Sequence, residues 1–499
     1  MKPSRTIVTL EGLVRLRLQI RSCRNPDCPR HRACLRPEQE GRFALPQQEF
    51  GLDVIALVGR LRHAGRRSVP EIHAELVRRG VPICERSVGN LLDRYDELLA
   101  LACVDPTRLR AAVAAQGRAI LAIDGLHPMS DEVRWVVREV LSGEVLLARS
   151  LLSSTQDDLA ALLVEVKAAL GDAPIAGVVS DGQTSIRKAV ARALPGMPHQ
   201  LCHFHYLREG ALPIYEADRH AKVQLKKKVR GVRPIERQVE GRDDAEAEAV
   251  RGYCAAVWSA LTDDGRPPLE ASGLKLQARL EKVAASMDRG RRKGGLPKEL
   301  KRLRAILAKG LDATAEAWPE IRKSFGWVRR FAAILANPPG HDAAGVRRRF
   351  DGLLAPLARH GEFRGVLAAS FAHFRKATRS YRPHLFASYD VQGLPRTNND
   401  LGQFFGSYRY HERRCSGRKV ACPGTVVRGS VRLVAAAARR TRPIEAGDLV
   451  PRDPAEWREL RASLERRRAV RTLGRRLRRD PDAYLQHLEE SLVNRALLP

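Results

Sequence analysis

The sequence predicts a multidomain α/β protein, in which a mixed β-sheet core is interrupted by a large all-α insertion and preceded by a small helical module. Three observations lead to this prediction. Apolar runs with strand character alternate with amphipathic helices in residues 115–209, residues 210–395 turn helical and highly charged, and a cluster of short helices precedes both regions. A chain of 499 residues is long enough for roughly two to four domains.

Composition and charge narrow the possible functions. Apolar residues make up 44% of the chain, and 88 Lys and Arg against 57 Asp and Glu leave a formal net charge of +31. Such a charge favours a polyanionic partner, although composition does not separate DNA from RNA or an anionic membrane. No apolar run approaches the roughly 18 residues of a membrane span. Arginines interrupt the N-terminal apolar stretch, unlike in a secretory signal, and nine unevenly placed cysteines fit a reducing compartment. We therefore expect a cytoplasmic protein without a membrane partner.

Residues 1–45 contain a cluster of candidate metal ligands. Cys23, Cys28, His31 and Cys34 follow the spacing C-x4-C-x2-H-x2-C within a segment rich in Pro and Arg. Thiolates and an imidazole this close in sequence could form a tetrahedral Zn²⁺ site, which would stabilise a segment too short to build a core. The alternative is three free thiols and a chance histidine.

Residues 46–105 show the pattern of a helix-turn-helix module. Apolar residues recur at helical spacing in 47–64, a capping box with proline begins a second helix at Ser68, and a third helix is predicted from Glu85 to Leu101. A glycine turn separates the last two helices, as in DNA-binding helix-turn-helix domains. Arg86, Asn90 and Arg94 are then the candidate DNA contacts. An ordinary helical bundle is the alternative.

Residues 115–209 contain two aspartates, each at the end of an apolar strand. The predicted strands are 119–124, 133–140, 144–152, 175–180 and 199–206, with helices at 157–170 and 183–194. This order matches the RNase H-like arrangement, in which the fourth strand lies beside the first. Asp124 and Asp181 would then meet at one end of the sheet, where Mg²⁺ (or Mn²⁺) would neutralise them and support phosphoryl transfer. The alternative is two strand-end turns, since Asp-Gly is a common turn dipeptide.

Three short motifs carry a resemblance to a known family. Ala122-Ile123-Asp124-Gly125, Val179-Ser180-Asp181-Gly182 and Cys202-His203-Phe204-His205 resemble motifs of the Mutator-like and related bacterial insertion-sequence transposases, which are DDE-type enzymes. The pattern spans about residues 118–430. The resemblance implies that Asp124 and Asp181 are the first two acids of a catalytic triad, and that Cys202 and His205 form a C-x2-H motif. These last two residues could bind metal, position DNA or hold the fifth strand.

The third acid of that triad is missing from its expected position. In the resembled transposases a catalytic Glu follows a Thr-Asn turn by three positions, and counting from Asn399 gives residue 402, which is glycine. The closing helix of the core is predicted within residues 396–440. Asp400 is two positions away, near the opposite side of the helix, and Glu412 is about 80° round and roughly 15 Å along the helix. Neither replaces the carboxylate, so strand cleavage and transfer are expected to be severely reduced.

Basic runs mark the remaining segments. In residues 210–395 the runs 224–228, 289–293 and 347–349 alternate with apolar stripes that include Trp258. The resembled class carries a long helical insertion here, which we expect to hold DNA ends through arginines on phosphates and exposed aromatics on unstacked bases. Each run taken singly is more often a solvated helix face. The next basic segment contains four candidate phosphate contacts, namely Arg413, Arg414, Arg418 and Lys419. Residues 441–499 are predicted to form a basic helical tail for DNA contact, oligomer contact or neither.

The leading hypothesis is an insertion-sequence transposase that binds terminal inverted repeats and target DNA as double strands and acts as a homo-oligomer in the bacterial nucleoid. The alternative is a transposase-derived DNA-binding protein or repressor without catalysis. A cellular RNase H-type nuclease is a weaker hypothesis, because it leaves the N-terminal module and the long insertion unexplained.

Overall fold

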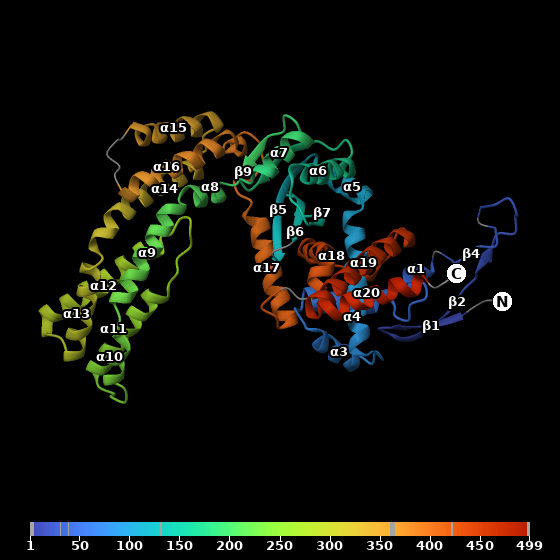
Figure 1. The fold of residues 1–499 in the computed structure, drawn as a ribbon, viewed down its shortest axis with the longest axis horizontal. Coiled ribbons are helices and arrows are strands. Elements are labelled where there is room, and N and C mark those ends of the chain that lie inside the picture. Colours follow the sequence, from blue (N-terminus) through green and yellow to red (C-terminus); the bar gives the residue numbers. More distant parts are fainter. Residues whose placement is uncertain are drawn as a thin grey trace. The chain divides into compact units, whose positions relative to one another are not determined.

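The computed structural model describes residues 4–29, 31–37, 39–129, 132–359, 365–420 and 423–496. It forms two compact units, each assembled from segments distant in the sequence (Figure 1). The first contains Met1–Val178, Gln183–Met197 and Asn399–Pro499, and the second contains Val179–Gly182 and Pro198–Asn398. Among the described helices, none combines the length and hydropathy needed to cross a bilayer.

A mixed five-stranded sheet lies where the sequence predicts strands. In spatial order its strands are β7 (Val145–Leu151), β6 (Glu132–Glu139), β5 (Ala119–Met129), β8 (Ile175–Ser180) and β9 (His199–Leu201). Strands β5, β6 and β7 form an antiparallel meander. At the start of β5, the Ala119 N–H donates to the carbonyl of Pro174, just before β8, over 2.8 Å. The predicted strand order, with the fourth strand beside the first, is confirmed.

Helices pack on this sheet within the first unit. They are α5 (Pro106–Gln116), α6 (Gln156–Leu170) and α7 (Thr184–Ala193), and they share one apolar core with Leu121 and Ile123 of β5. The start of α6 is determined locally, because Thr155 and Asp158 form a reciprocal capping box. Burial of β5 on both faces explains its unbroken apolar run. This burial also fixes the position of Asp124, which lies on the same strand.

The N-terminal helices agree closely with prediction. They are α2 (Leu52–His63), α3 (Val69–Arg78) and α4 (Glu85–Val104). The predicted capping box is present, since the Ser68 hydroxyl accepts from the Glu71 N–H and the Glu71 carboxylate accepts from the Ser68 N–H. Gly80 has φ +79°, which ends α3 in the expected turn. The predicted start of the first helix at residue 47 is wrong, because Gln47 has a positive φ of 61° and the helix begins only after Gly51.

Further elements complete the first unit. Before α2 lie β1 (Ser4–Thr9), β2 (Gly12–Arg17), β3 (Arg21–Ser22), β4 (Cys34–Leu35) and α1 (Glu40–Phe43). At the C-terminal side lie α17 (Asn399–Ser416), α18 (Pro423–Thr441), the short 3₁₀ helix η4 (Ala446–Leu449), α19 (Pro454–Arg479) and α20 (Pro481–Ala496). Helix α18 packs against both α4 and β7, and α17 lies against β5. The closing helices therefore contact the sheet and the N-terminal helices alike.

The second unit is helical, as predicted for residues 210–395. Its helices are α8 (His203–Gly210), α9 (Leu212–Lys228), α10 (Val232–Gln238), α11 (Ala245–Thr262), α12 (Ser272–Gly294), α13 (Lys298–Asp312), α14 (Trp318–Ala336), α15 (Ala343–Arg359) and α16 (Gly365–Tyr381), with 3₁₀ turns η1 (Ala315–Ala317), η2 (Arg382–His384) and η3 (Ala387–Tyr389). One core is mainly aliphatic and is formed by the consecutive helices α9, α10, α11, α12 and α13. Another is rich in aromatic residues and is formed by α8, α14, α15 and α16.

The predicted fifth strand is wrong beyond Leu201. It was expected to reach Tyr206, but α8 begins at His203. Tyr206 and Leu207 are buried together on one side of this helix, in the aromatic core of the second unit. Aromatic and histidine residues alternate here as the residues of a strand would. Only the packing of the tertiary core shows that the segment is a helix.

Candidate functional site

Asp124 lies on the central strand β5, where full burial of the strand ends. Ala119 to Ile123 are at most 5% exposed, whereas Asp124 is half-buried. It pairs with Val136 of β6, and its Oδ1 accepts a hydrogen bond of 2.8 Å from the N–H of Gly125. The sheet therefore holds the backbone of Asp124 rigidly while its carboxylate remains partly accessible.

Asp181 follows β8 directly and belongs to the second unit. Just before it, the hydroxyl of Ser180 bonds Nε2 of His199 on β9 over 2.8 Å. Just after it, Gly182 leaves no room for a side chain, because a Cβ there would lie 1.8 Å from the Tyr381 hydroxyl. Close packing against Tyr381 thus requires the glycine of this Asp-Gly pair.

Cys202 and His205 belong to the end of β9 and the start of α8, not to one strand. The Cys202 N–H donates to the Ser180 carbonyl over 2.8 Å, and its Sγ accepts from the Asn398 N–H over 3.3 Å. Burial lowers the pKa of His205, and the carboxylate of Asp181 opposes this shift. Cys202 therefore anchors the segment that leads to α17, while His205 lies within electrostatic range of Asp181.

Gly402 lies in the first turns of α17 and is exposed. A Cβ at this position would meet no atom within 4 Å, so no steric reason requires glycine. Glycine in a helix interior costs up to about 1 kcal/mol relative to alanine, so the residue does not serve stability. Leu401, Phe404 and Phe405 bury the opposite face of the helix.

The two acids nearest to this position are both engaged elsewhere. Asp400 forms an ion pair with Arg138 of β6. Glu412 is 8% exposed, accepts a hydrogen bond of 2.7 Å from the Thr425 hydroxyl and pairs with Arg62 at 3.6 Å. Its pKa is lowered, because the charges of Arg432 and Arg62 outweigh the effect of burial. Asp400 and Glu412 are thus each held by partners within the first unit.

No preformed metal centre is found in the part of the chain that the structure describes, where no three His, Cys, Asp or Glu side chains are placed to hold one ion. The N-terminal cluster nevertheless comes together through its backbone. Cys23 bridges to His31, Cys34 pairs with Ser22, and the His31 N–H donates to the Cys28 carbonyl over 2.8 Å. His31 Nδ1 bonds the carbonyl of Asn25, which leaves Nε2 as its candidate ligand atom.

The residues predicted to contact DNA fall into three groups. Arg86 and Asn90 are exposed on the first turns of α4, and Arg413, Arg418 and Lys419 are exposed at the end of α17 or just beyond it. Arg94 is half-buried, and burial and the neighbouring Arg461 lower its pKa. Arg414 forms an ion pair of 3.0 Å with Glu71 of α3. Five of the seven side chains are therefore open to a phosphate backbone.

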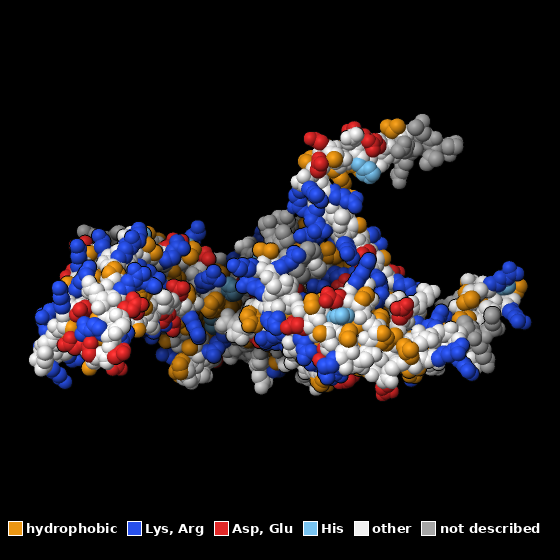
Figure 2. Space-filling model, turned by 90° about the horizontal axis from the view of Figure 1, so that it is seen from below, with side chains coloured by type: hydrophobic (Ala, Val, Ile, Leu, Met, Phe, Trp, Pro, Cys, Tyr) orange, Lys and Arg blue, Asp and Glu red, His pale blue; other side chains and the backbone are white. Residues whose placement is uncertain are grey.

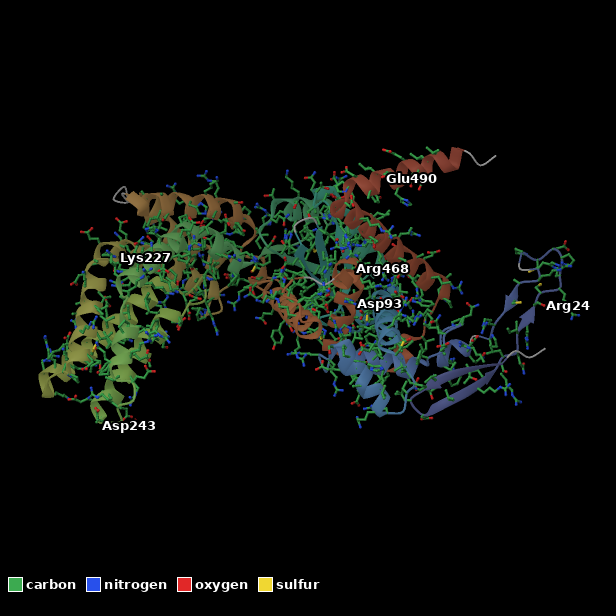
Figure 3. All side chains as sticks on the ribbon, turned by 60° about the horizontal axis from the view of Figure 1, so that its bottom comes forward. Arg24, Asp93, Lys227, Asp243, Arg468 and Glu490 are labelled. Atoms are coloured by element: carbon green, nitrogen blue, oxygen red, sulfur yellow. The ribbon has the colours of Figure 1, made fainter. Side chains whose placement is uncertain are left out.

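Sequence reasoning missed a buried charge network between α4 and α18. Arg428 contacts Glu97 and Asp93, and Arg432 contacts Asp96 and Asp93. The indole N–H of Trp457 on α19 also donates to Glu97 over 2.9 Å. Figure 3 labels Asp93 on α4. A signal in the sequence was the set of acids at i, i+3 and i+4, Asp93, Asp96 and Glu97, in the half of α4 that is rich in apolar residues.

Neither a protein-family model nor a curated protein matches this sequence. Among solved structures, the chain is similar to the Drosophila P element transposase in its strand transfer complex. The identity is 13%, the TM-score is 0.33, and the match covers 80% of this chain and 94% of the other. A similarity of this size does not assign the chain to that protein's fold or activity.

Proposed function

We propose that this protein is an insertion-sequence DNA transposase with an RNase H-like core, whose cleavage activity is impaired because Gly402 occupies the position of the third catalytic carboxylate. The surroundings of Gly402 carry this proposal. The position is exposed with room for a side chain, while Asp400 is paired with Arg138 and Glu412 is buried among arginines. The strand order β7-β6-β5-β8-β9 also supports it.

Within this proposal, Asp124 and Asp181 hold Mg²⁺ (or Mn²⁺). Asp124 stands on β5, and Asp181 follows β8, the next strand of the sheet. A divalent ion bound by carboxylates supplies Lewis-acid activation of a water or hydroxyl and stabilises the leaving oxygen. The chain's own carboxylates contribute the negative charge that holds the ion. Two carboxylates make a weaker site than three, which is the physical reason for the expected loss of activity.

We further propose double-stranded DNA as the partner, namely terminal inverted repeats and target DNA. Arg86 and Asn90 at the start of α4 would contact the DNA, because they are exposed where a recognition helix begins. Arg413, Arg418 and Lys419 add exposed cations for the phosphate backbone. Figure 2 shows Lys and Arg spread over the face that it draws, in keeping with the net charge of +31.

The decisive experiment restores the carboxylate. Gly402→Glu should raise metal-dependent nicking of a supercoiled plasmid carrying the DNA that flanks this gene, by about 10²–10³-fold, the typical effect of one preorganised group in an active site. Gly406→Glu is the matched control, since Gly406 is also exposed on α17 with open space around its Cβ. A folded Gly402→Glu variant that binds the DNA but nicks no faster than Gly406→Glu would contradict the assigned role of position 402.

A second candidate function is a transposase-derived DNA-binding protein that blocks element ends. The engagement of Asp400 and Glu412 favours it, because each of these two carboxylates already has a partner, Arg138 for Asp400 and the Thr425 hydroxyl for Glu412. The same assay separates the two functions. Slow metal-dependent nicking by the wild-type protein supports an impaired enzyme, whereas tight binding with no nicking supports the binder.

Three further proposals accompany the function. The first is Zn²⁺ binding by Cys23, Cys28, His31 and Cys34, supported by the backbone contacts that draw this segment together. Elemental analysis of the purified protein, with Cys23→Ser as control, would measure it. The second is a homo-oligomer, and the third is a location in the bacterial nucleoid, both of which suit a protein that joins DNA ends.

A further inference from the structure

A hollow of about 570 Å³ lies in the second unit, where the end of α9, the start of α10 and the end of α11 meet. Trp258 of α11 forms part of its wall and is 37% exposed. The other four tryptophans are less exposed, and three of them are at most 6% exposed. An indole exposed in a hollow offers a flat face on which a planar ligand can stack.

Cations surround this tryptophan. The hollow is lined by Lys226, Lys227, Arg230 and Arg233, and no Asp or Glu belongs to its described lining. None of the four cations forms an ion pair in the described residues, although the charge of Lys226 contributes to the lowered pKa of Asp264. Neighbouring cations of the same unit are paired. Lys222 pairs with Asp264, and Arg304 pairs with Asp288. Figure 3 labels Lys227 in this unit. The four charges are therefore available to an anionic ligand.

The hollow is held open by its own backbone. Val229 and Val232 are at most 2% exposed and insert into the aliphatic core, so the intervening and following arginines, Arg230 and Arg233, are directed outward. Gly231 has φ +106°, which makes this alternation possible at the junction of α9 and α10. Val257 and Leu261 anchor α11 on either side of Trp258. The aromatic wall and the cations thus need no rearrangement to meet a ligand.

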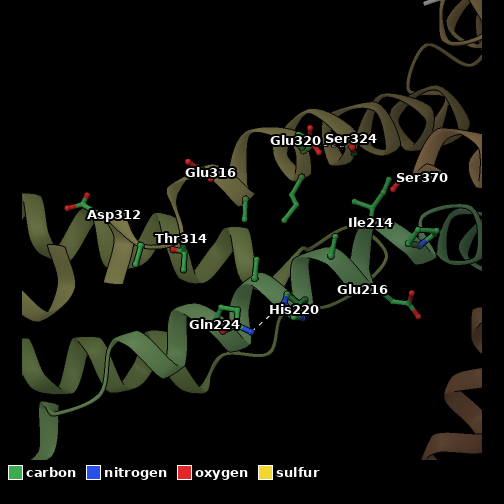
Figure 4. Close-up of a pocket in the computed structure, with 16 residues that line it drawn as sticks. Ile214, Glu216, His220, Gln224, Asp312, Thr314, Glu316, Glu320, Ser324 and Ser370 are labelled. Carbon is green, nitrogen blue, oxygen red and sulfur yellow. Dashed lines mark hydrogen bonds between the residues drawn. The ribbon is translucent and has the colours of Figure 1, made fainter. Parts of the chain in front are cut away.

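A larger hollow in the same unit has the opposite charge. It measures about 950 Å³ and lies between α9 and α14 (Figure 4). Glu216, Asp312, Glu316 and Glu320 line it, and its described lining contains no Lys or Arg. An anionic ligand is repelled by this acidic hollow and attracted to the basic hollow of Trp258. The second unit therefore has one acidic and one basic hollow at different places.

We propose that the Trp258 hollow binds an unpaired nucleotide at the end of a DNA strand, with the base stacked on the indole and the flanking phosphates held by Lys226, Lys227, Arg230 and Arg233. This inference rests on the proposed function for its DNA partner. The combination is specific to unpaired nucleotides, because the bases of an intact duplex are stacked on each other and expose only their edges.

The experiment compares binding of a fluorescent single-stranded oligothymidylate with that of a blunt duplex of equal length. Trp258→Ala should weaken single-strand binding roughly 10- to 100-fold, the range of base–aromatic stacking, and leave duplex binding unchanged. Trp258→Phe should retain most of the affinity, whereas Trp258→Leu, which keeps the apolar volume without an aromatic face, should not. These two variants keep the test decisive if alanine disturbs the fold.

Charge is tested separately. The double variant Arg230→Gln with Arg233→Gln is expected to bind single strands with a weaker salt dependence. The slope of log binding constant against log salt concentration should become shallower by about 1.4, as expected for two lost phosphate contacts. Arg292→Gln with Lys293→Gln is the matched control, since both residues are exposed cations at the end of α12, away from this lining. Equal losses in the two pairs would overturn the assignment of the phosphate contacts.

The outcomes also separate this inference from the proposed function. Wild-type protein that binds neither DNA form contradicts the proposed function. Wild-type protein that binds the duplex, with single-strand affinity equal in Trp258→Ala and wild type, overturns the stacking site alone. Affinity that depends on the arginines but not on Trp258 also overturns it, because the hollow would then be a plain phosphate surface.

Discussion

Two histidines are held neutral by burial, one in each unit. His203 is 5% exposed, and its Nε2 bonds the Leu385 carbonyl over 2.8 Å. His411 is 7% exposed and stacks on His63 with 5.5 Å between the ring centroids. Burial is the main cause that lowers the pKa of each to about 4. Neither imidazole is therefore charged near neutral pH.

These shifts predict an acid-sensitive stability. The folded-state pKa lies below the unfolded value of about 6.5, so the unfolded state takes up protons first as the pH falls. The stability contribution is complete above pH 6.5 and is lost as the pH drops toward 4, by at most about 3 kcal/mol for each group. Urea unfolding of wild type, His203→Gln and His411→Gln across this range measures it. Identical pH slopes in all three proteins would contradict the assignment.

Among the elements, α4 and α18 are joined by ion pairs rather than by apolar contact alone. Arg432 is 8% exposed, and its Nε lies 3.2 Å from Oδ2 of Asp96, which is itself 1% exposed. It also faces Glu412 of α17 at 3.8 Å. One guanidinium therefore neutralises carboxylates from two different helices, and its own helix supplies neither of them.

Removing that guanidinium should strongly destabilise the first unit. Arg432→Leu leaves two buried carboxylates without their main cation, and we expect a loss of about 3–5 kcal/mol in unfolding free energy. The control is Arg149→Leu, which breaks an exposed pair with Glu165 and should cost under about 1 kcal/mol. Thermal and urea unfolding compare the two. Similar small losses in both variants would show that the network contributes little.

For the whole molecule, the most distinctive surface is the C-terminal arm, defined as residues 470–493 of α19 and α20. Leu485, Leu488 and Leu492 of α20 are 41–68% exposed at spacings of three and four. Acids lie on α20, including Glu490 (Figure 3), and a dense basic run ends α19. An exposed apolar stripe with complementary charges fits the same arm of a second copy.

The arm therefore predicts how the proposed homo-oligomer forms. Leu485→Asp with Leu488→Asp should convert a dimer to a monomer, because the carboxylates cannot be buried at a helix interface. Val77→Asp with Val164→Asp is the matched control, since both valines are exposed outside the arm. Light scattering after gel filtration measures the mass. An unchanged mass in the arm variant would exclude the arm as the interface.

Local signals explain where prediction succeeded. The capping box at Ser68 and Glu71, the turn at Gly80 and the apolar run before Asp124 each depend on residues within a few positions, so the sequence displays them directly. Prediction failed where distant residues decide. Arg94 resembles any exposed helix arginine until α19 covers it, and His203 to Tyr206 resemble a strand until the aromatic core selects a helix.

The sequence by itself determined that position 402 holds no carboxylate, that two aspartates each end an apolar strand, and that the chain is strongly basic. Covalent structure alone decides these facts. The tertiary structure decided that Asp400 and Glu412 are engaged by Arg138, Arg62 and Arg432, and that Trp258 shares a hollow with cations of α9 and α10. Those contacts join residues far apart in the chain, and their energies depend on burial and distance, which no local pattern records.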